Sequence, residues 1–281
     1  MRIISLRRAD VCCVCGKDLA AGDRAAWDPG PRTVTCTDCT ETPTTFDRGT
    51  AGGSLQQTAA RRKERHQQQQ EAKVAADRAW REEIKTQRPV LGRLASAVTP
   101  RARVEPEPAH VRSWAQGVPG ELRVGEVLDS VEGIAVLHDR KVRGGRANID
   151  HIAVTPSGVW VIDTKRYPDK QVEFRDVGGW FRTDECLMVG GRDHTKLVDA
   201  MAWQVQAVTT AANGMLEDVS VRPMLCFVES TWGWFPKAFR VRGVAVCWPL
   251  ALPEILTRPG DLDAERIDSL ARRLATALPP A

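Results

Sequence analysis

The sequence predicts an α/β protein in three parts: a small cysteine-rich module, a long polar helix with a linker, and a larger α/β domain. Five of its eight cysteines lie within the first 39 residues. A stretch rich in strong helix formers, without glycine or proline, then runs from 54 to 88. The remainder alternates short β-branched runs with amphipathic segments, which is typical of a sheet covered by helices.

The three parts are expected at residues 1–48, 49–111 and 112–281, because 281 residues exceed the roughly 100–200 of a typical domain. Apolar content of 42% with 27% charged residues is ordinary for a soluble globular chain. No run of about 18 apolar residues occurs, which argues against a transmembrane helix. The first ten residues carry three arginines and no apolar segment, so they do not resemble a secretory signal, and the expected compartment is the cytoplasm.

Two pairs of cysteines in the first part have the spacing of a zinc site. Cys12 with Cys15 and Cys36 with Cys39 form two C-x2-C pairs separated by 20 residues. Each pair turns two thiolates toward one point, and four thiolates match tetrahedral structural zinc. We therefore expect these four residues to bind structural Zn²⁺, with Cys13 left over, while a redox dithiol pair is the alternative. The three later cysteines stand singly among apolar residues and are expected to be buried.

The second part carries the positive charge of the chain. Residues 61–112 have a net charge of +6, although the whole chain has only +4. Strong helix formers dominate residues 55–87, so we expect a solvent-exposed helix there. Three prolines between 99 and 110 then predict an extended linker. The basic helix is expected either to attract nucleic-acid phosphates or to serve only as a solvated spacer.

The third part predicts strands and helices in mixed order. Its first helix, at 113–131, carries an apolar stripe at i, i+3, i+4 and i+7, formed by Val124, Val127, Leu128 and Val131. The other elements follow from β-branched runs and from helical periodicity: strands at 133–138, 148–154, 158–166, 171–174, 180–183, 221–228 and 241–248, and helices at 194–213 and 264–278. This order of elements predicts a single α/β domain.

Two of these strands flank a Pro-Ser-Gly turn and are expected to form a hairpin. If Val154 pairs with Val159, Asp150 falls directly opposite Asp163, with Cβ atoms about 4.5–5.5 Å apart. Lys165 lies two residues beyond Asp163 and so shares its face of the sheet. Two like charges at that separation are costly to bury unless a divalent cation lies between them. A surface cluster of ion pairs on an exposed sheet face is the alternative.

The helix before this hairpin adds a third carboxylate. Glu121 lies three residues before Val124 and so extends the apolar stripe toward the N-terminal end of the helix. Glu126 lies about 200° around the helix from Val124 and is expected to face water. Glu121 is therefore the charge that the amphipathic pattern does not explain.

Four short motifs resemble the nuclease-related domain family, NERD, over about residues 112–230. They are Gly117-Val118-Pro119-Gly120-Glu121, Asn148-Ile149-Asp150-His151, Ser157-Gly158-Val159 and Ile162-Asp163-Thr164-Lys165. The family is similar to the PD-(D/E)xK superfamily, so the resemblance implies a restriction-endonuclease-like mixed β-sheet flanked by helices and a magnesium-dependent phosphodiesterase site. It places Glu121, Asp150 and Asp163 at the acidic positions, Lys165 at the lysine, and Gln204 at a helix position that faces the site. Where this chain has Asp163, the family often has Glu.

The same residues suit phosphodiester hydrolysis on chemical grounds. Asp150 and Asp163 offer the hard oxygen ligands that Mg²⁺ prefers, and the ion would polarise a phosphoryl oxygen and activate a water. Lys165 is expected to orient that water or to stabilise charge on the phosphate, and Glu121 to bind a second or outer-sphere ion. His151 points to the opposite face of the sheet and is expected to be structural.

An aromatic cluster, Trp232-Gly233-Trp234-Phe235, follows the strand at 221–228. Rings in such a cluster can stack on nucleobases. Packing beneath a loop is the commoner arrangement and is the one expected here.

Together these observations predict a Mg²⁺-dependent nuclease that hydrolyses DNA phosphodiester bonds, with the zinc module and the basic helix aiding substrate binding. Two alternatives stay open. One is a nuclease-fold module, catalytically weak or inactive, that binds nucleic acid or a protein partner. The other is a zinc-stabilised protein-interaction adaptor without affinity for nucleic acid. Cleavage with Mg²⁺ separates the enzyme from the binding module, and binding that is flat across salt concentrations favours the adaptor.

Overall fold

A computed structural model of the chain describes residues 2–13, 17–30, 32–41, 46–87, 100, 102–103, 109–142, 147–178, 183–212, 216 and 218–281. The chain divides into two compact units: Met1–Gly53 with Pro119–Ala281, and Ser54–Val118. Of the helices in the described part of the chain, none combines the length and the apolar character that crossing a membrane requires.

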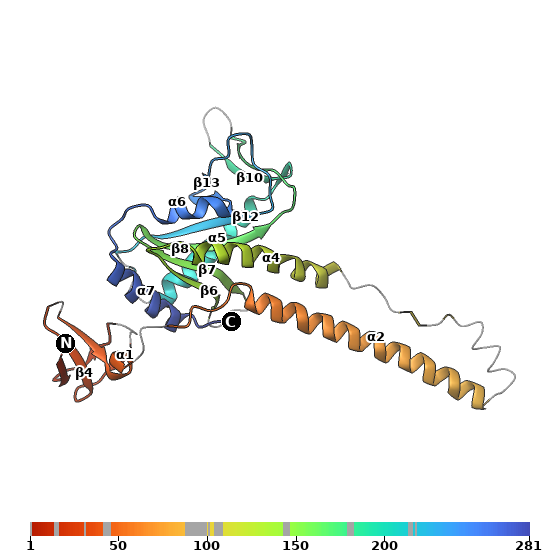
Figure 1. Ribbon diagram of the computed structural model, residues 1–281, viewed down its shortest axis with the longest axis horizontal. Helices are drawn as coiled ribbons and strands as arrows, with labels where there is room; N and C mark the ends of the chain where they lie inside the picture. Colours follow the sequence, from red (N-terminus) through yellow and green to blue (C-terminus); the bar gives the residue numbers. More distant parts are fainter. Residues whose placement is uncertain are drawn as a thin grey trace. The chain divides into compact units, whose positions relative to one another are not determined.

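The unit Ser54–Val118 contains nearly all of α2 (Gly53–Gln87), which matches the helix expected at 55–87 (Figure 1). Most of its side chains are exposed or half-buried, as its polar composition requires. Arg81 is the buried residue of this helix, and its guanidinium donates hydrogen bonds to Asp77 (2.9 Å) and to the Pro100 carbonyl (3.0 Å). Neighbouring pairs of this kind, at i and i+4, stabilise a helix that has no apolar face.

The larger unit is built on a six-stranded mixed sheet with the order β13-β14-β12-β8-β7-β6 (Figure 1). The strands are β6 (Ala135–Lys141), β7 (Asn148–Thr155), β8 (Gly158–Arg166), β12 (Val221–Val228), β13 (Phe239–Val241) and β14 (Val244–Cys247). β12 pairs in parallel with both β8 and β14, and the other pairs are antiparallel. Because β12 and β8 are parallel, their C-terminal ends, where polar residues follow the apolar runs, meet at one edge.

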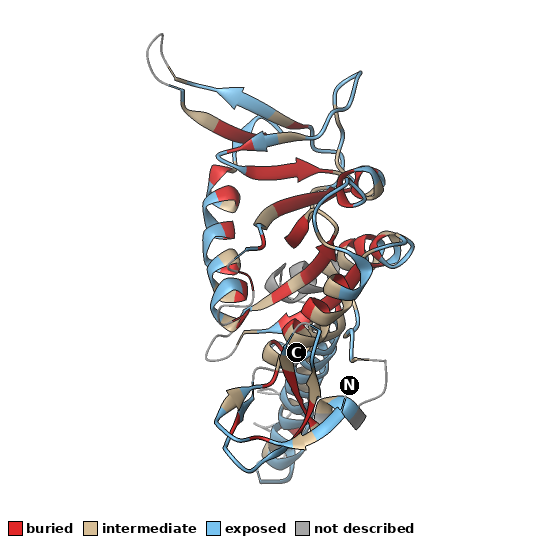
Figure 2. Cartoon of the chain, turned by 90° about the vertical axis from the view of Figure 1, so that its left-hand side faces the viewer, coloured by how far each residue is buried: buried red, intermediate tan, exposed pale blue. Residues whose placement is uncertain are grey.

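Helices cover both faces of this sheet, which confirms the predicted mixed α/β architecture. α5 (Thr195–Ala212) and α7 (Ala264–Ala277) pack on the face that carries Ile152 and Val161. The opposite face is covered by α4 (Ala109–Asp129) and α6 (Leu252–Leu256). Figure 2 shows that buried residues concentrate in the strands and on the helix sides that face them.

A second, three-stranded sheet consists of β9 (Val172–Asp176), β10 (Glu185–Val189) and β11 (Arg192–Asp193). The sequence predicted β9 but placed the next strand at 180–183. Residues 179–182 lie outside the described part of the chain, and the strand that the structure contains begins at Glu185.

The strand predicted at 241–248 is confirmed for β14 (Val244–Cys247), but its start is wrong, because Val241 ends the preceding strand and a turn separates the two. Val241 pairs with Val244, and the two residues between them, Arg242 and Gly243, have φ angles of 47° and 83°. Positive φ at both central residues is the signature of a two-residue type I′ turn. The short helix α6 was also not predicted, since its five residues are too few to show a helical period.

The N-terminal residues form a small sheet of their own, in the order β1-β4-β5. It comprises β1 (Arg2–Ser5), β4 (Arg24–Asp28) and β5 (Thr33–Cys36), beside the short pair β2 (Asp10–Val11) and β3 (Asp18–Leu19) and the helix α1 (Thr37–Glu41). Its core is small and includes two cysteines, Cys12 and Cys36, among its buried residues. So few apolar side chains supply little stability, and a metal would add what is missing.

Arg140 anchors the C-terminal end of the chain to β6. Its fully buried guanidinium donates hydrogen bonds to the carbonyls of Leu278 (2.6 Å), Ala275 (2.8 Å) and Asp47 (3.1 Å). Burial lowers the pKa of Arg140 to about 10, although Asp47 and Asp139 oppose the shift, so the side chain stays charged at neutral pH.

We expect Arg140→Met to lower the free energy of unfolding by about 3 kcal/mol, because it removes charge-assisted hydrogen bonds and leaves buried carbonyls without a donor. Urea denaturation measures the change. Arg258→Met, at a far more exposed arginine, is the matched control and should change stability by less than about 0.5 kcal/mol. Equal effects of the two substitutions would contradict this role of Arg140.

Candidate active site

Glu121 is brought to the sheet by α4. Val124 and Leu128 of this helix are fully buried against the sheet, whereas Glu126 is exposed, as predicted. Gly120 is buried where α4 passes β8, and a Cβ atom there would lie 3.3 Å from Arg166 Cβ. The small residue therefore lets the helix approach closely enough to set Glu121 over the end of the strand.

The β7–β8 hairpin has the predicted register. Val154 pairs with Val159, and the ladder runs to His151 and Ile162, one pair short of the two aspartates. Gly158 forms the turn with a φ of 129°, and a Cβ atom there would meet the Ser220 carbonyl oxygen at 2.5 Å. Only glycine fits both conditions, so this residue fixes the register of the hairpin.

Asp150 lies where the two strands separate. Its Oδ2 accepts a hydrogen bond from the backbone N–H of Thr164 at 2.8 Å. This N–H lies beyond the last backbone pair of the two strands, so the side chain replaces the missing backbone acceptor. The pKa of Asp150 is raised well above its usual value, mainly by burial and further by the negative charges of Asp163 and Glu121. The positive charge of Lys165 and the hydrogen bond from Thr164 oppose this shift but do not cancel it.

Asp163 and Lys165 form an ion pair at the end of β8. Lys165 Nζ lies 2.5 Å from Asp163 Oδ2, and Asp163 is only 8% exposed. Burial alone would lower the pKa of Lys165, but the charges of Asp163 and Asp150 and the hydrogen bond to Asp163 outweigh it and raise the pKa. Lys165 is consequently protonated at neutral pH and cannot serve as a base.

Glu121 shares the electrostatic environment of these residues. Its pKa is raised to about 7, first by burial and then by the charges of Asp139 and Asp163, while Lys165 and a backbone hydrogen bond from Gly52 oppose the shift. One lysine thus faces several carboxylates, and the negative charge in excess is what a cation would neutralise.

Asp139 belongs to this cluster and was missed in the sequence. It is buried, and the register of β6 and β7 puts it opposite Asp150, between the pairs His138–His151 and Arg140–Ile149. Its φ of 49° is rare for a residue other than glycine, and strain of this kind gathers at functional sites. A signal existed, because Asp139 follows an apolar run much as Asp163 does.

By strand register, then, Asp139, Asp150 and Asp163 lie in a row across three adjacent strands, with Glu121 reaching them from α4. We call these four residues and Lys165 the acidic cluster. Among the described residues, the group of three potential ligands whose ligand atoms all lie within 4.8 Å of one another is a cysteine group, so the carboxylates are spaced more widely.

Gln204 lies on the buried side of α5, the helix that packs on the other face of the sheet from α4. The residue is 6% exposed, and its Oε1 has no hydrogen-bond partner among the described residues. The burial agrees with a position that faces inward. The residues that contact Gln204 are not defined by a hydrogen bond, so its role in the site stays a prediction.

His151 lies on the α4 face of the sheet, away from Ile152 and Val161. It is fully buried, and its Nδ1 lies 2.8 Å from Nδ1 of His138, whose Nε2 lies 3.1 Å from Asp129 on α4. Burial and the neighbouring His138 lower the pKa of His151 well below its usual value. A neutral imidazole held in this way ties α4 to the sheet, in keeping with the structural role expected for it.

Three of the four predicted zinc ligands come together. Ligand atoms of Cys12, Cys36 and Cys39 all lie within 4.8 Å of one another, and the Cys36 N–H donates to Cys12 Sγ at 3.2 Å. Cys15, the fourth predicted ligand, lies outside the described residues. Cys13 points elsewhere, with its Sγ 3.3 Å from Thr35 Oγ1. The predicted burial of the three later cysteines, Cys186, Cys226 and Cys247, is confirmed.

The aromatic cluster after β12 divides into two parts. Trp232 packs against Trp248, with ring centroids 4.9 Å apart, and against Phe239. In contrast, Trp234 and Phe235 are 99% and 90% exposed. The expectation that the cluster packs beneath a loop holds for its first residue and is wrong for the last two.

Comparison with protein families agrees with this geometry. The family model that matches is NERD, the nuclease-related domain, and it covers residues 116–228. No curated protein and no solved structure matches the chain. The matched segment begins before Glu121 and ends with β12, so it contains every residue of the acidic cluster. Residues 116–228 of this protein are therefore similar to the nuclease-related domain.

Proposed function

We propose that the protein is a metal-dependent nuclease that hydrolyses DNA phosphodiester bonds at the acidic cluster. The observation that carries the proposal is the row Asp139, Asp150 and Asp163, with Lys165 paired to Asp163. Glu121 interacts electrostatically with Asp139 and Asp163 of this row. The row lies within the segment that matches the nuclease-related domain. Excess carboxylates at a strand end are expensive unless a cation binds there, and phosphodiester hydrolysis uses such a cation.

The donor set fits magnesium. Carboxylate oxygens of Asp150, Asp163 and Glu121 are the hard ligands that this ion prefers. Burial and mutual repulsion raise the pKa values of Glu121 and Asp150, and a bound cation would relieve that repulsion. Bound there, Mg²⁺ would polarise the scissile phosphate and lower the pKa of a coordinated water. Asp139 would add to the negative charge near Glu121.

Lys165 would act as a cation and not as a base. Because its pKa is raised, it carries a positive charge at neutral pH and stabilises negative charge that develops on the phosphate. Its ion pair with Asp163 holds the ammonium in place before substrate arrives. Since Lys165 and a cation compete for Asp163, we expect the lysine to turn toward the phosphate when the metal binds.

The test uses supercoiled plasmid and end-labelled linear DNA, each with Mg²⁺ and with excess EDTA. We expect cleavage only with Mg²⁺, and a loss of about 100-fold or more in Lys165→Met, equivalent to about 3 kcal/mol of transition-state stabilisation. Glu126→Gln, an exposed carboxylate on the same helix as Glu121, should cleave as the wild type does. Cleavage that persists in EDTA, or in Lys165→Met, would contradict the proposal.

A second candidate is a nuclease-fold module that binds nucleic acid without cleaving it. The wide spacing of the carboxylates and the closed Lys165–Asp163 pair favour it. Binding of DNA with no cleavage under any divalent cation would select this reading over the enzyme.

We also propose that the N-terminal module binds one structural Zn²⁺ through Cys12, Cys15, Cys36 and Cys39. The convergence of three thiols and the N–H···S hydrogen bond on Cys12 support it. The module has few apolar residues, so it depends on the metal for its fold.

Metal analysis of the purified chain should therefore find about one zinc per molecule. Cys39→Ser should lose it and make the first 48 residues sensitive to protease. Cys13→Ser, the neighbouring cysteine bonded to Thr35, should keep the zinc. Loss of zinc from Cys13→Ser but not from Cys39→Ser would overturn the ligand assignment.

A further inference from the structure

A pocket of about 520 Å³ lies at the C-terminal end of β12. Its lining includes Phe227, which pairs with Lys165 across β12 and β8, and Arg123, an exposed residue of α4. The pocket is thus one strand away from the residues proposed to cleave the phosphodiester bond. A nucleic-acid strand bound at the cluster would place its neighbouring nucleotides here.

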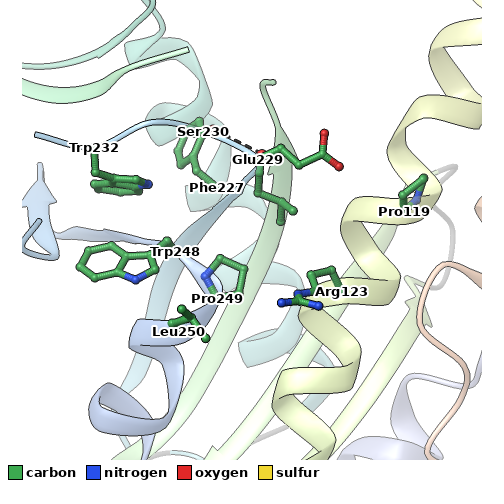
Figure 3. A pocket seen from close by; sticks show the side chains of 10 residues that line it. Pro119, Arg123, Phe227, Glu229, Ser230, Trp232, Trp248, Pro249 and Leu250 are labelled. Carbon is green, nitrogen blue, oxygen red and sulfur yellow. Dashed lines mark hydrogen bonds between the residues drawn. The ribbon is translucent and has the colours of Figure 1, made fainter. Parts of the chain in front are cut away.

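The lining of the pocket combines flat rings with a cation. Figure 3 shows the indoles of Trp232 and Trp248 on one side and Arg123 extending from α4 on the other. A volume of about 520 Å³ lies within the range of pockets that hold small ligands. Aromatic faces and arginine guanidinium planes are the groups on which unpaired nucleobases stack.

Apolar side chains extend this surface into solvent. Trp234 and Phe235 are two and three residues beyond Trp232 and are almost fully exposed, and Leu250, in the pocket lining, is 76% exposed. Single exposed apolar residues need no explanation, but Trp234 and Phe235 are consecutive in the chain and closely follow a residue that lines the pocket, so we group them with it. We call Trp234, Phe235, Leu250 and the pocket the aromatic surface.

The charges near the aromatic surface allow a polyanion to approach. Glu229 lines the pocket, but its carboxylate is paired with Arg166 at 2.6 Å, and this bond lowers its pKa. Arg123 is exposed. The result is an apolar surface with an exposed arginine, Arg123, and an acidic residue, Glu229, that is paired with Arg166. This combination suits the bases and phosphates of a strand.

We infer that the aromatic surface binds unpaired nucleotides of single-stranded nucleic acid and feeds them to the acidic cluster. Base pairs inside a duplex present their edges and not their faces, so they cannot stack on these rings. The inference rests on the proposed function for the cleavage step, while the binding itself does not depend on catalysis. It narrows the substrate class to single strands, overhangs or frayed ends.

The test measures binding of fluorescently labelled dT20 and of a blunt 20-base-pair duplex by anisotropy, in Ca²⁺ and without turnover. The variants are the double substitution Trp234→Ala/Phe235→Ala and, separately, Arg123→Ala. Stacking contributes about 1–3 kcal/mol per base, so we expect the double variant to bind dT20 about 10-fold to 100-fold more weakly. Its binding to the duplex should change by less than about twofold.

Matched controls are Trp203→Ala, a tryptophan of α5 that is 42% exposed, and Arg258→Ala. Both should bind dT20 as the wild type does. Since Trp234 and Phe235 contact little, unchanged thermal unfolding verifies that the double variant is folded.

Equal binding of dT20 by the double variant and the wild type would overturn the inference, as would an equal loss for dT20 and duplex. A protein or other partner would then be the occupant of this surface. In a third outcome, the double variant loses dT20 binding, while the wild type binds dT20 but does not cleave DNA. That result would support the aromatic surface and refute only the proposed nuclease activity. The two failures are therefore separable.

Discussion

Glu121→Gln is expected to stabilise the metal-free protein at pH 8 while it abolishes cleavage. The pKa of Glu121 is raised to about 7, so the folded state holds its proton more tightly than the unfolded chain, whose value is near 4.5. The stability from this proton is complete below about pH 4.5 and is lost as the pH rises through about 7. Above that pH the folded protein carries the cost of an ionised carboxylate beside Asp139 and Asp163.

Glutamine resembles the protonated acid and avoids that cost. After allowance for partial exposure and screening, we expect the free energy of unfolding to rise by about 1–2 kcal/mol at pH 8 and by little at pH 4.5. Urea denaturation at both pH values measures it. Glu126→Gln, on the exposed side of the same helix, should change stability at neither pH.

Such a trade of stability for activity is what a functional carboxylate shows. A Glu121→Gln protein that is less stable than the wild type at pH 8 would mean that the carboxylate makes favourable contacts, and the electrostatic account of the site would be wrong.

The second prediction concerns the cation itself. Mg²⁺ should raise the melting temperature at pH 8, and this increase should vanish in Asp150→Asn. At 100 times the dissociation constant a ligand adds about 2.7 kcal/mol, which is about 5–10 °C for a domain of this size. Asparagine keeps the acceptor for the Thr164 N–H, so the substitution removes the charge and little else.

Asp261→Asn, at an exposed aspartate, is the matched control and should keep the full increase. At pH 5.5 the increase should be smaller in the wild type, because Glu121, with a pKa of about 7, then holds a proton that Mg²⁺ must displace. The raised pKa of Asp150 acts in the same direction. An increase that is the same in Asp150→Asn as in the wild type would place the ion elsewhere.

Much of the α/β domain follows from local patterns. The β7–β8 hairpin was predictable with its register, because the β-branched runs and the Pro-Ser-Gly turn leave few other pairings. The stripe on α4 likewise identified Glu121 as misplaced and Glu126 as solvated. These signals are local in the chain, and tertiary packing does not override them.

Other features depend on contacts between distant segments. Asp139 joins the site only because β6 pairs with β7, and the sequence of β6 alone does not indicate its partner. The hairpin at Arg242-Gly243 was read as one strand, because a single glycine within a β-branched run is a weak turn signal. The exposure of Trp234 and Phe235 could not be predicted from the sequence either, because aromatic side chains in such clusters are usually packed against the protein.

The central claim is that the acidic cluster is a divalent-cation site at which phosphodiester bonds are cleaved. Its most direct test is the rate of plasmid cleavage with Mg²⁺ by the wild type and by Asp150→Asn, purified in parallel and with equal binding to DNA. The account predicts cleavage by the wild type and a loss of about a thousandfold in the variant, equivalent to about 4 kcal/mol. Equal rates in the two proteins, or no cleavage by the wild type, would contradict it.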